Sequence, residues 1–484
     1  MEVIKRPLSG KNNELVSGNL SREVSHCCPP RVKTYISGES PSTPYYVLPE
    51  FYQSVVDGEM YLLEANSLRW WKTSGLDECT KKREELNKLG RVQRPMAQRL
   101  SESGFHGVTF NITHACNLRC TYCYIQNNVP DSNKVVSLDI AKKCLLRYGK
   151  DTFGVNFMGG EPTLCMDRIK EIVDFSRRIF RKPRFNIVTN GTLLNKPFVG
   201  GKTVAEYLDS ENFSMTISLD GPEPVHNKYR VRADGKGSFS DVLAGLQHIR
   251  GTPLGKRAYL RGTVSSEVLK SEFRFKDRLA YLNALVSEGY GAGVSLEFVD
   301  LSESNCKNDI EVTLGDVDTT LNEWRTQILE GAKWYVTEIN LGHKPSWFLM
   351  NTYLTRLQTR RPTINYCGAG SGSFTCGPDG TLYACHHIEN MEMGSVTAGI
   401  DPERHETLFA DSRIYRRPLC MKCPIRYLCG GGCRAASLHF YKDVTKPVEA
   451  ICKLHRVMVE CAMYVLSHCD VTQILERSKQ PGSK

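Results

Sequence analysis

Three cysteines within eight residues are the strongest chemical signal in this chain. Cys116, Cys120 and Cys123 are spaced C-x3-C-x2-C and follow a short β-patterned run at 108–113. Three thiolates can hold three irons of a four-iron cluster and leave the fourth iron open to a small molecule. Structural zinc sites use four ligands, commonly in two pairs, and no second pair lies nearby. The spacing therefore favours an iron–sulfur cluster over zinc, and over a chance grouping among 19 cysteines.

A glycine-rich turn follows one strand–helix unit later. Gly159, Gly160, Glu161 and Pro162 come directly after a predicted strand at 154–158. Glycines let the backbone approach a ligand closely, and the neighbouring carboxylate can receive an ammonium group. Alone, this tetrapeptide is an ordinary turn. Its place after the cysteine motif makes it a candidate binding element.

Together the two motifs resemble the radical S-adenosylmethionine (SAM) enzymes. In that family the open iron binds the methionine amino and carboxylate groups of SAM, and one electron from the cluster cleaves SAM to a 5′-deoxyadenosyl radical. The resemblance implies that the three cysteines are catalytic. It implies SAM-binding roles for Tyr122, Gly159, Gly160, Glu161, Pro162, Asn190 and Ser218. Asp220 is a further catalytic candidate, although the Asn-Gly and Asp-Gly-Pro pairs around these strand ends are also common turn formers.

A second cysteine group lies between residues 367 and 452. Apart from Cys376, it has seven cysteines at the spacing of interest, which are too many for one tetrahedral centre and nearly enough for two four-iron clusters, with a pair of zinc ribbons as the alternative. The spacing resembles the SPASM domain, an auxiliary-cluster module of radical SAM maturases. By that resemblance an outer cluster is held by Cys420, Cys423, Cys429 and Cys452, and an inner cluster by Cys367, Cys385 and Cys433.

The fourth ligand of the inner cluster is left open by the sequence. Cys376 is the nearest candidate, but it also fits a buried structural thiol. Cys306 and a substrate thiolate are the other possibilities. His386 directly follows Cys385, at a position where sulfatase-maturing members of the family carry an Asp that acts as base. His386 is therefore a candidate proton acceptor, and the difference disfavours formylglycine formation.

Strand and helix patterns alternate from residue 108 onward. Six strands are expected, at 108–113, 154–158, 185–189, 214–219, 259–264 and 294–299. Repeated units predict a parallel sheet that binds ligands at the carboxyl ends of its strands. The resemblance completes the fold class: α/β, with a six-unit partial (β/α) barrel core, a C-terminal SPASM iron–sulfur domain and a small N-terminal α+β subdomain. The expected divisions are an arm at 1–44, the subdomain at 45–104, the core at 105–300, a helical bridge at 301–360, the SPASM domain at 361–470 and a tail at 471–484.

The expected N-terminal subdomain combines short β-like runs with a charged helix. The runs lie at 45–48, 60–64 and 69–72, and the helix at 76–89. This order resembles the winged-helix elements with which peptide-modifying radical enzymes grip a leader peptide; a plain packing subdomain is the alternative. Residues 69–99 contain nine Lys or Arg and four Asp or Glu in a chain of net charge +10. The basic excess in this segment indicates either a solvated helix surface or a face that binds an acidic peptide.

The resemblance implies a peptide-modifying radical SAM oxidoreductase that uses SAM and three [4Fe-4S] clusters. The radical would take hydrogen from a peptide or small protein with a leader segment, and we expect a thioether cross-link to follow. The alternatives are a carbon–carbon cyclophane synthase, a formylglycine-type maturase, and a non-catalytic iron–sulfur scaffold or electron carrier. A flavodoxin or ferredoxin is the expected reductant. With no apolar span or signal peptide, we expect a cytoplasmic protein without membrane or nucleic-acid partners.

Overall fold

The computed structural model describes residues 46–47, 50–88, 92–93, 104–123, 125, 134–264, 272–298, 317–387, 391–409 and 413–477. All six expected core strands form, and they lie side by side in chain order with parallel pairing. They are β6 (Gly107–Thr113), β7 (Gly154–Gly159), β8 (Arg184–Thr189), β9 (Ser214–Ser218), β10 (Ala258–Val264) and β11 (Gly293–Phe298). The predicted fold class, an α/β core on a parallel sheet, is confirmed.

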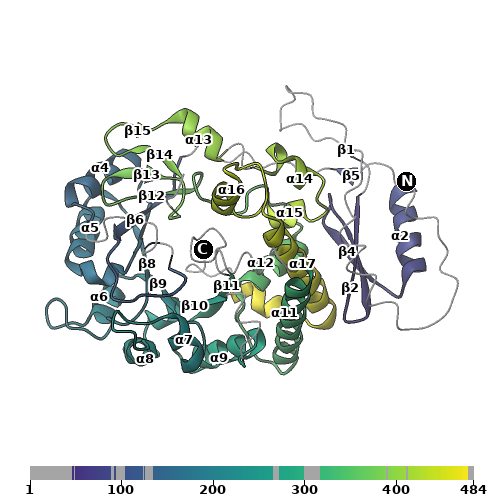
Figure 1. Cartoon of the computed structure of the whole chain (residues 1–484), viewed down its shortest axis with the longest axis horizontal. Coiled ribbons are helices and arrows are strands. Elements are labelled where there is room, and N and C mark those ends of the chain that lie inside the picture. The colour runs from purple at the N-terminus through teal and green to yellow at the C-terminus, as the bar shows by residue number, and fades with distance from the viewer. Residues whose placement is uncertain are drawn as a thin grey trace. The chain divides into compact units, whose positions relative to one another are not determined.

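Helices connect these strands and cover one face of the sheet (Figure 1). They are α4 (Leu138–Tyr148), α5 (Met166–Ile179), α6 (Val204–Ser210), α7 (Glu223–Tyr229), α8 (Phe239–Gln247) and α9 (Phe275–Ser287). Helix α4 begins after Ser137, whose hydroxyl accepts the Ile140 amide at 3.2 Å. The strands alternate as a half-buried sheet should: in β9, Met215 and Ile217 are buried towards the helices, and polar residues occupy the other face.

Four short strands extend this sheet beyond β6. They are β12 (Ser373–Cys376), β13 (Thr381–Tyr383), β14 (Glu392–Ser395) and β15 (Gly399–Ile400). Strand β12 pairs in parallel with β6, and the next three pair antiparallel. The C-terminal cysteine region is therefore continuous with the core sheet, a junction that the sequence analysis did not predict.

The N-terminal subdomain is a three-stranded meander followed by a helix. Its elements are β2 (Phe51–Val56), β3 (Glu59–Glu64), β4 (Arg69–Thr73) and α2 (Leu76–Lys88), with two-residue strands β1 (Tyr46–Val47) and β5 (Val92–Gln93) pairing beside them. Strand β2 was not predicted. The run expected at 45–48 contributes only β1. Asp57 and Gly58 form the β2–β3 turn with φ of 52° and 78°, as expected for a tight hairpin.

The remaining helices form most of the C-terminal half. They are α11 (Val317–Asn340), α12 (Phe348–Thr359), α13 (Pro402–Phe409), α14 (Pro418–Met421), α15 (Arg426–Cys429), α16 (Arg434–Tyr441), α17 (Glu449–His468) and α18 (Thr472–Arg477). The expected bridge is thus helical where it is described. Its first residues, including Cys306, lie outside the described part.

Buried polar contacts fasten the N-terminal subdomain to these helices. The Tyr52 hydroxyl of β2 donates to the Glu460 carboxylate of α17, and Arg325 of α11 lies 3.2 Å from the same carboxylate. Arg325 also donates to the Val55 carbonyl at 2.5 Å. Tyr52 and Glu460 are both nearly inaccessible to solvent. The subdomain is consequently held by specific contacts and not by the chain connection alone.

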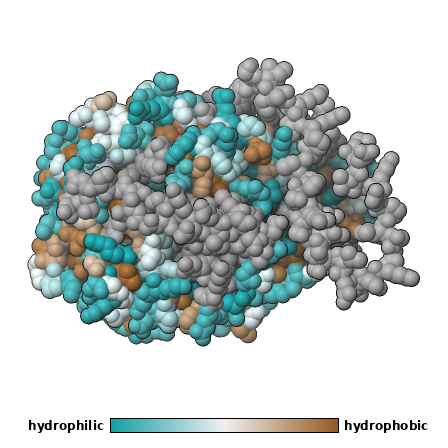
Figure 2. Space-filling model, in the orientation of Figure 1, coloured by the Kyte–Doolittle hydropathy of each residue, from teal (hydrophilic) through white to brown (hydrophobic). Residues whose placement is uncertain are grey.

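On the face drawn in Figure 2, the described residues are mostly hydrophilic, with hydrophobic residues in small groups. Exposed large hydrophobic side chains are spread along the sequence, from Leu76 to Tyr441. Within the described ranges, we find no helix with the length and apolar character that crossing a membrane requires.

Candidate functional site

The loop after β6 brings Cys116, Cys120 and Cys123 together at the carboxyl end of that strand. None of the three thiols forms a disulfide. The Cys123 amide donates to the Cys120 carbonyl at 3.0 Å, which closes a turn between the last two cysteines. The Arg119 amide donates to the Val231 carbonyl at 2.6 Å and fastens the loop to the segment after α7.

The electrostatics of these thiols fit an iron–sulfur cluster. Burial raises the pKa of Cys116 to about 12, with further increases from Glu161 and from the other two cysteines. Burial also raises the pKa of Cys120 to about 11, although Arg230 lowers it. Thiols of this kind stay protonated at neutral pH unless a metal supplies positive charge. The three sulfurs are close enough to perturb one another, as ligands of one cluster must be.

Gly159 and Gly160 let the end of β7 approach the start of this loop. A Cβ on Gly159 would lie 2.2 Å from the Thr113 carbonyl oxygen, and one on Gly160 would lie 2.2 Å from the Ala115 oxygen. The Gly160 amide donates to the Thr113 carbonyl at 2.8 Å. The glycines are therefore required by backbone contact between two strand ends. The sequence analysis had expected them to make room for a ligand.

Glu161 is fully buried and joins the ends of β7 and β8. One carboxylate oxygen accepts the Thr163 amide and hydroxyl at 3.0 and 2.5 Å and the Thr189 hydroxyl at 2.7 Å. The other oxygen accepts the Asn190 amide at 2.7 Å. Burial raises the pKa of Glu161, while these hydrogen bonds oppose the rise. Among the described residues, the second oxygen accepts the Asn190 amide alone, so it retains a lone pair for the ammonium group that the resemblance assigns to it.

Asn190 connects the same strand end to the cysteine loop. Its side-chain amide donates to the Asn117 oxygen at 2.8 Å and lies 3.9 Å from the Cys116 sulfur. Its own oxygen accepts the Thr192 amide and hydroxyl at 3.0 and 2.7 Å. These contacts support Asn190 as a residue that orients the loop. Ser218, at the end of β9, is half-buried, and its hydroxyl makes no hydrogen bond to another described residue.

Asp220, for which a catalytic role was predicted, lies in a buried ion pair. Its carboxylate is 3.1 Å from Arg230 and accepts the Thr263 amide at 2.8 Å and the Tyr122 hydroxyl. Asp220 has no exposed surface. Burial alone would raise the pKa of Asp220. The positive charges of Arg230 and Arg278 outweigh this effect, so the net shift of the pKa is downward. Asp220 is therefore a charged anchor.

The same contacts place Tyr122 beside Arg230, a buried cation that was not predicted from the sequence. The Tyr122 ring lies 5.3 Å from the Arg230 guanidinium and 6.0 Å from the Tyr229 ring. The SAM-binding role that the resemblance implies for Tyr122 stays a prediction. An arginine shortly after an Asp-Gly-Pro turn was the available signal for Arg230, because a buried carboxylate requires a cation nearby.

The face of the sheet opposite the helices is polar. By strand alternation it carries Thr109, Asn156, Asn186, Thr216, Ser218, Arg261, Ser295 and Glu297. Arg261 of β10 is paired in register with Ser218 and Ser295. Burial lowers the pKa of His386, and the charges of His387 and Arg261 lower it further. Its role as a proton acceptor stays a prediction.

The four cysteines predicted to hold the outer cluster gather around one buried position. They come from α14, α15, α17 and the connecting turn, and none forms a disulfide. Burial raises the pKa of Cys420 to about 11 and that of Cys429 to about 12, and neighbouring cysteines add to both. Burial raises the pKa of Cys452 as well, with contributions from the other three. This set fits a four-cysteine cluster.

A single metal ion needs its ligand side chains closer together than a cluster does. Among the described residues, no group of three or more His, Cys, Asp or Glu side chains is arranged to hold a single ion. A cubane keeps its four thiolates farther apart than a tetrahedral zinc ion does. The arrangement is thus compatible with the cluster interpretation.

The segments of the predicted inner cluster also meet. Arg434, which follows Cys433, donates to the Ala369 carbonyl at 2.6 Å and to the Cys367 carbonyl at 3.5 Å. A Cβ on Gly370 would lie 3.2 Å from the Ala384 side chain, beside Cys385. Three segments bearing the cysteines at 367, 385 and 433 are therefore adjacent.

Cys376 occupies the other face of the sheet, and this argues against its predicted role as the fourth inner ligand. In β12 it is paired in register with Phe110 of β6 and Leu382 of β13, both buried. Its thiol hydrogen bonds with Cys144 of α4. Cys385 lies beyond the end of β13 (Thr381–Tyr383) and is only partly buried. We therefore interpret Cys376 as a buried structural thiol.

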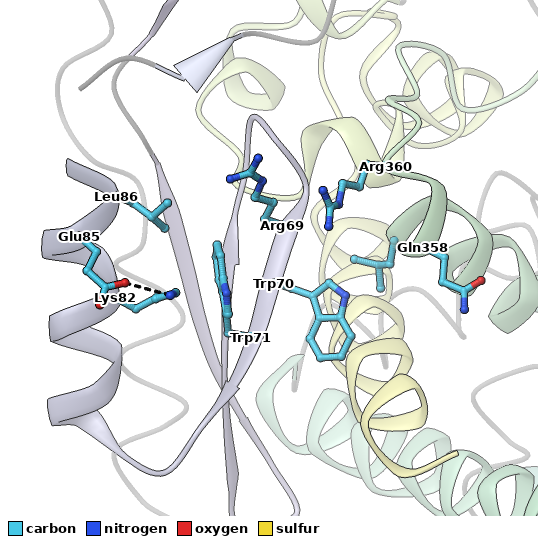
Figure 3. Close-up of a pocket in the computed structure, with 9 residues that line it drawn as sticks. Arg69, Trp70, Trp71, Lys82, Glu85, Leu86, Gln358 and Arg360 are labelled. Carbon is cyan, nitrogen blue, oxygen red and sulfur yellow. Dashed lines mark hydrogen bonds and ion pairs between the residues drawn. The ribbon is translucent and has the colours of Figure 1, made fainter. Parts of the chain in front are cut away.

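A groove of about 610 Å³ runs along the free edge of β4 (Figure 3). Among the described strands, β4 pairs only with β3. The lining residues come from β4, α2 and the end of α12: Arg69, Trp70, Trp71, Lys82, Glu85, Leu86, Leu357, Gln358 and Arg360. Lys82 lies 2.9 Å from Glu85 and 5.5 Å from the centre of the Trp71 ring. The groove thus combines two indoles with three cations and one carboxylate.

Replacing Cys376 by Ala should lower the free energy of unfolding by about 1 kcal/mol, because a small cavity is left beside Cys144. The iron content should not change. Chemical denaturation and iron assay of the anaerobically purified protein measure both quantities. Cys385→Ala is the matched control and should lose iron. Equal iron loss from both variants would restore Cys376 as a ligand.

Replacing Asp220 by Asn should lower the free energy of unfolding by about 3 kcal/mol without SAM present, because Arg230 loses its buried counter-charge. The stabilisation from Asp220 is present above its unfolded pKa of about 4 and is lost as pH falls through its lower folded pKa. Urea unfolding at neutral and acidic pH tests this, with Ser218→Ala as the control. A variant as stable as the parent but unable to cleave SAM would instead identify a catalytic residue.

Comparison with known proteins agrees with this geometry. Residues 110–255 match the family model of the radical SAM superfamily. A cysteine-type anaerobic sulfatase-maturating enzyme of Clostridium novyi is 24% identical over 351 residues, which cover 66% of this chain and 85% of that protein. A serine-type anaerobic sulfatase-maturating enzyme of Klebsiella aerogenes is 24% identical over 377 residues, which cover 72% of this chain and 84% of that protein.

A solved structure shows the same fold. Native anSMEcpe with bound AdoMet superposes with a TM-score of 0.58 at 17% identity, covering 75% of this chain and 98% of that one. The non-catalytic scaffold interpretation finds no support in these matches. The chain contains a radical SAM domain, which binds SAM and a [4Fe-4S] cluster, and it is an enzyme.

Proposed function

We propose that this enzyme is a radical SAM maturase that takes a hydrogen atom from a peptide substrate and closes a thioether cross-link. The observation that carries the proposal is the joining of two thiol-rich sites through one sheet: β6 leads into the three-cysteine loop, and β12, its neighbour, belongs to the C-terminal cysteine region. The polar face of the core would give a peptide segment hydrogen-bonding groups.

Cofactors would supply the difficult step. SAM and a [4Fe-4S] cluster, when bound, provide a 5′-deoxyadenosyl radical. Cys116, Cys120 and Cys123 would hold that cluster, and the two C-terminal sets would hold two more. Asn190 and Glu161 would keep the loop oriented. Thioether closure removes two hydrogens from the peptide: one leaves as an atom to the 5′-deoxyadenosyl radical, and the thiol hydrogen leaves as a proton and an electron. The clusters held by the C-terminal cysteine sets would accept the electron, and His386 is our candidate to accept the proton.

A second candidate is oxidation of a cysteine or serine side chain to formylglycine. The names of the relatives favour it, because they are sulfatase-maturating enzymes. His386 in place of an acidic residue after Cys385 is the observation against it. A carbon–carbon cross-link is the third outcome, and the product distinguishes all three.

Replacing Cys116, Cys120 and Cys123 together by Ala should abolish 5′-deoxyadenosine formation, because the open iron would be lost. About eight irons should remain on two further clusters. Anaerobic incubation with SAM and dithionite, chromatography and iron assay measure both. Retained 5′-deoxyadenosine formation, or an unchanged iron content, would contradict the assignment.

The product test incubates the enzyme with the peptide of any short open reading frame that is found beside its gene. A thioether removes two hydrogens and consumes one alkylatable thiol, whereas a carbon–carbon link removes two hydrogens and leaves the thiol. Formylglycine formation instead creates an aldehyde that reacts with hydrazides. Mass spectrometry after iodoacetamide or hydrazide treatment separates these products, and the absence of a consumed thiol would overturn the thioether proposal.

The groove at the edge of β4 is our proposed docking site for an acidic, extended leader segment. A free strand edge offers unpaired backbone donors and acceptors to a peptide strand. Arg69, Lys82 and Arg360 complement negative charge, and Trp70 and Trp71 offer apolar contact on the two sides of the strand (Figure 3). Deletion of the subdomain would not test this cleanly, because β2 is fastened to Glu460.

Reversing one charge in the groove should weaken peptide binding. Lys82→Glu should raise the Kd for an acidic leader peptide about tenfold, because an attraction becomes a repulsion at the groove wall. Its neighbour Lys81 is exposed on α2 but does not line the groove, so Lys81→Glu is the matched control. Fluorescence anisotropy with a labelled peptide measures both. Equal weakening by the two variants would indicate non-specific charge attraction and exclude the groove.

A further inference from the structure

Arg426 links the predicted outer-cluster ligands to the N-terminal subdomain. It lies in α15 between Cys423 and Cys429, and its side chain is 4% exposed. One guanidinium nitrogen donates to the Cys423 carbonyl at 3.0 Å and to the Glu50 carboxylate at 2.7 Å. The other donates to the Asn66 side-chain oxygen at 2.7 Å. A single buried cation thus contacts both the ligand loop and the subdomain.

The acceptors on the subdomain side are themselves held in place. The fully buried Glu64 carboxylate accepts the amides of Glu50, Asn66 and Ser67 at 3.2, 3.1 and 2.7 Å. It also lies 3.3 Å from the Asn66 side-chain nitrogen. Glu50 and Asn66 therefore meet Arg426 from a fixed backbone. The position of this guanidinium depends on the subdomain as much as on α15.

Other cations surround the same thiols. Arg417 is fully buried, Arg356 donates to the Leu428 carbonyl at 2.5 Å, and Arg456 hydrogen bonds with Cys423. Arg426 differs from them because its charge is paired with a carboxylate of the N-terminal subdomain. Glu50 is 38% exposed, so solvent weakens its effect relative to that of the buried Arg426.

We propose that Arg426 and Glu50 together set the reduction potential of the outer cluster. Reduction adds one electron to a cluster, and a buried cation nearby stabilises the added negative charge. Arg426 favours the reduced state, and Glu50 moderates this by countering the charge of Arg426. Arg426 acts as a positioning residue, and the N-terminal subdomain is part of the electrostatic environment of the cluster. This inference rests on the proposed outer-cluster ligand set.

Opposite potential shifts from two variants test the proposal. In the intact enzyme with all clusters present, Arg426→Gln should lower the midpoint potential of one auxiliary cluster, and Glu50→Gln should raise it by a smaller amount. Redox titration followed by electron paramagnetic resonance measures both. Glu449→Gln is the control: this carboxylate is 70% exposed and pairs with Lys453 at 3.2 Å, in the same helix as Cys452. The midpoint potential of the auxiliary cluster in Glu449→Gln should equal that of the parent enzyme.

Each outcome decides a separate question. An unchanged or lowered potential in Glu50→Gln overturns the proposal, and so does an unchanged potential in Arg426→Gln with full iron content. If Arg426→Gln loses iron, then Arg426→Lys, which keeps the charge, should retain iron and a potential nearer the parent, and Glu50→Gln still decides the charge effect. Absence of any auxiliary-cluster signal in the parent enzyme would refute the ligand set itself.

Discussion

The cysteine loop depends on the close approach of two neighbouring strand ends. Where β7 ends, a Cβ on Gly159 or Gly160 would come within 2.2 Å of a carbonyl oxygen at the start of the loop. Any side chain there would push the strand ends apart and would displace Glu161 along with the loop. Because the backbone contact alone forbids a side chain, these glycines are needed whichever ligand binds above them.

Buried carboxylates then fix the strand ends relative to one another. Glu161 ties β7 to β8 through hydrogen-bond donors, and Asp220 ties β9 to β10 through the Thr263 amide and Arg230. A buried charge is costly unless it is fully paired, so each network tolerates little displacement of its members. The hydrogen-bond and ion-pair partners of the two carboxylates offset the cost of burying them. Together they hold the strand ends in place beside the polar face of the sheet. Both carboxylates hold this arrangement together through their hydrogen bonds and ion pairs.

Periodicity and spacing predicted the parts of this molecule that are local in sequence. The six core strands followed from apolar runs, and the cysteine groups and the Gly-Gly-Glu-Pro turn followed from residue types at short spacing. The face occupied by Cys376 could not be predicted, because it depends on β12 pairing with β6, which lies far away in the sequence. The burial of Asp220 likewise depends on Arg230 and Arg278, which come from later segments. Strand β2 was missed because its run, Phe51–Val56, mixes polar and apolar residues.

The attachment of the N-terminal subdomain has a consequence for how a peptide could be presented. Helix α17 carries Cys452 near its start and Glu460 two turns later, and residues at this spacing lie on the same side of a helix. Glu460 holds Tyr52 of the subdomain, and Arg426 holds Glu50 beside the ligand loop. A recognition module on a loose linker would let a bound peptide sample many positions. If the groove binds a leader segment as we propose, these two attachments fix where the docked peptide begins. The length of chain between the docked segment and the modified residue would then select which residue reaches the polar face.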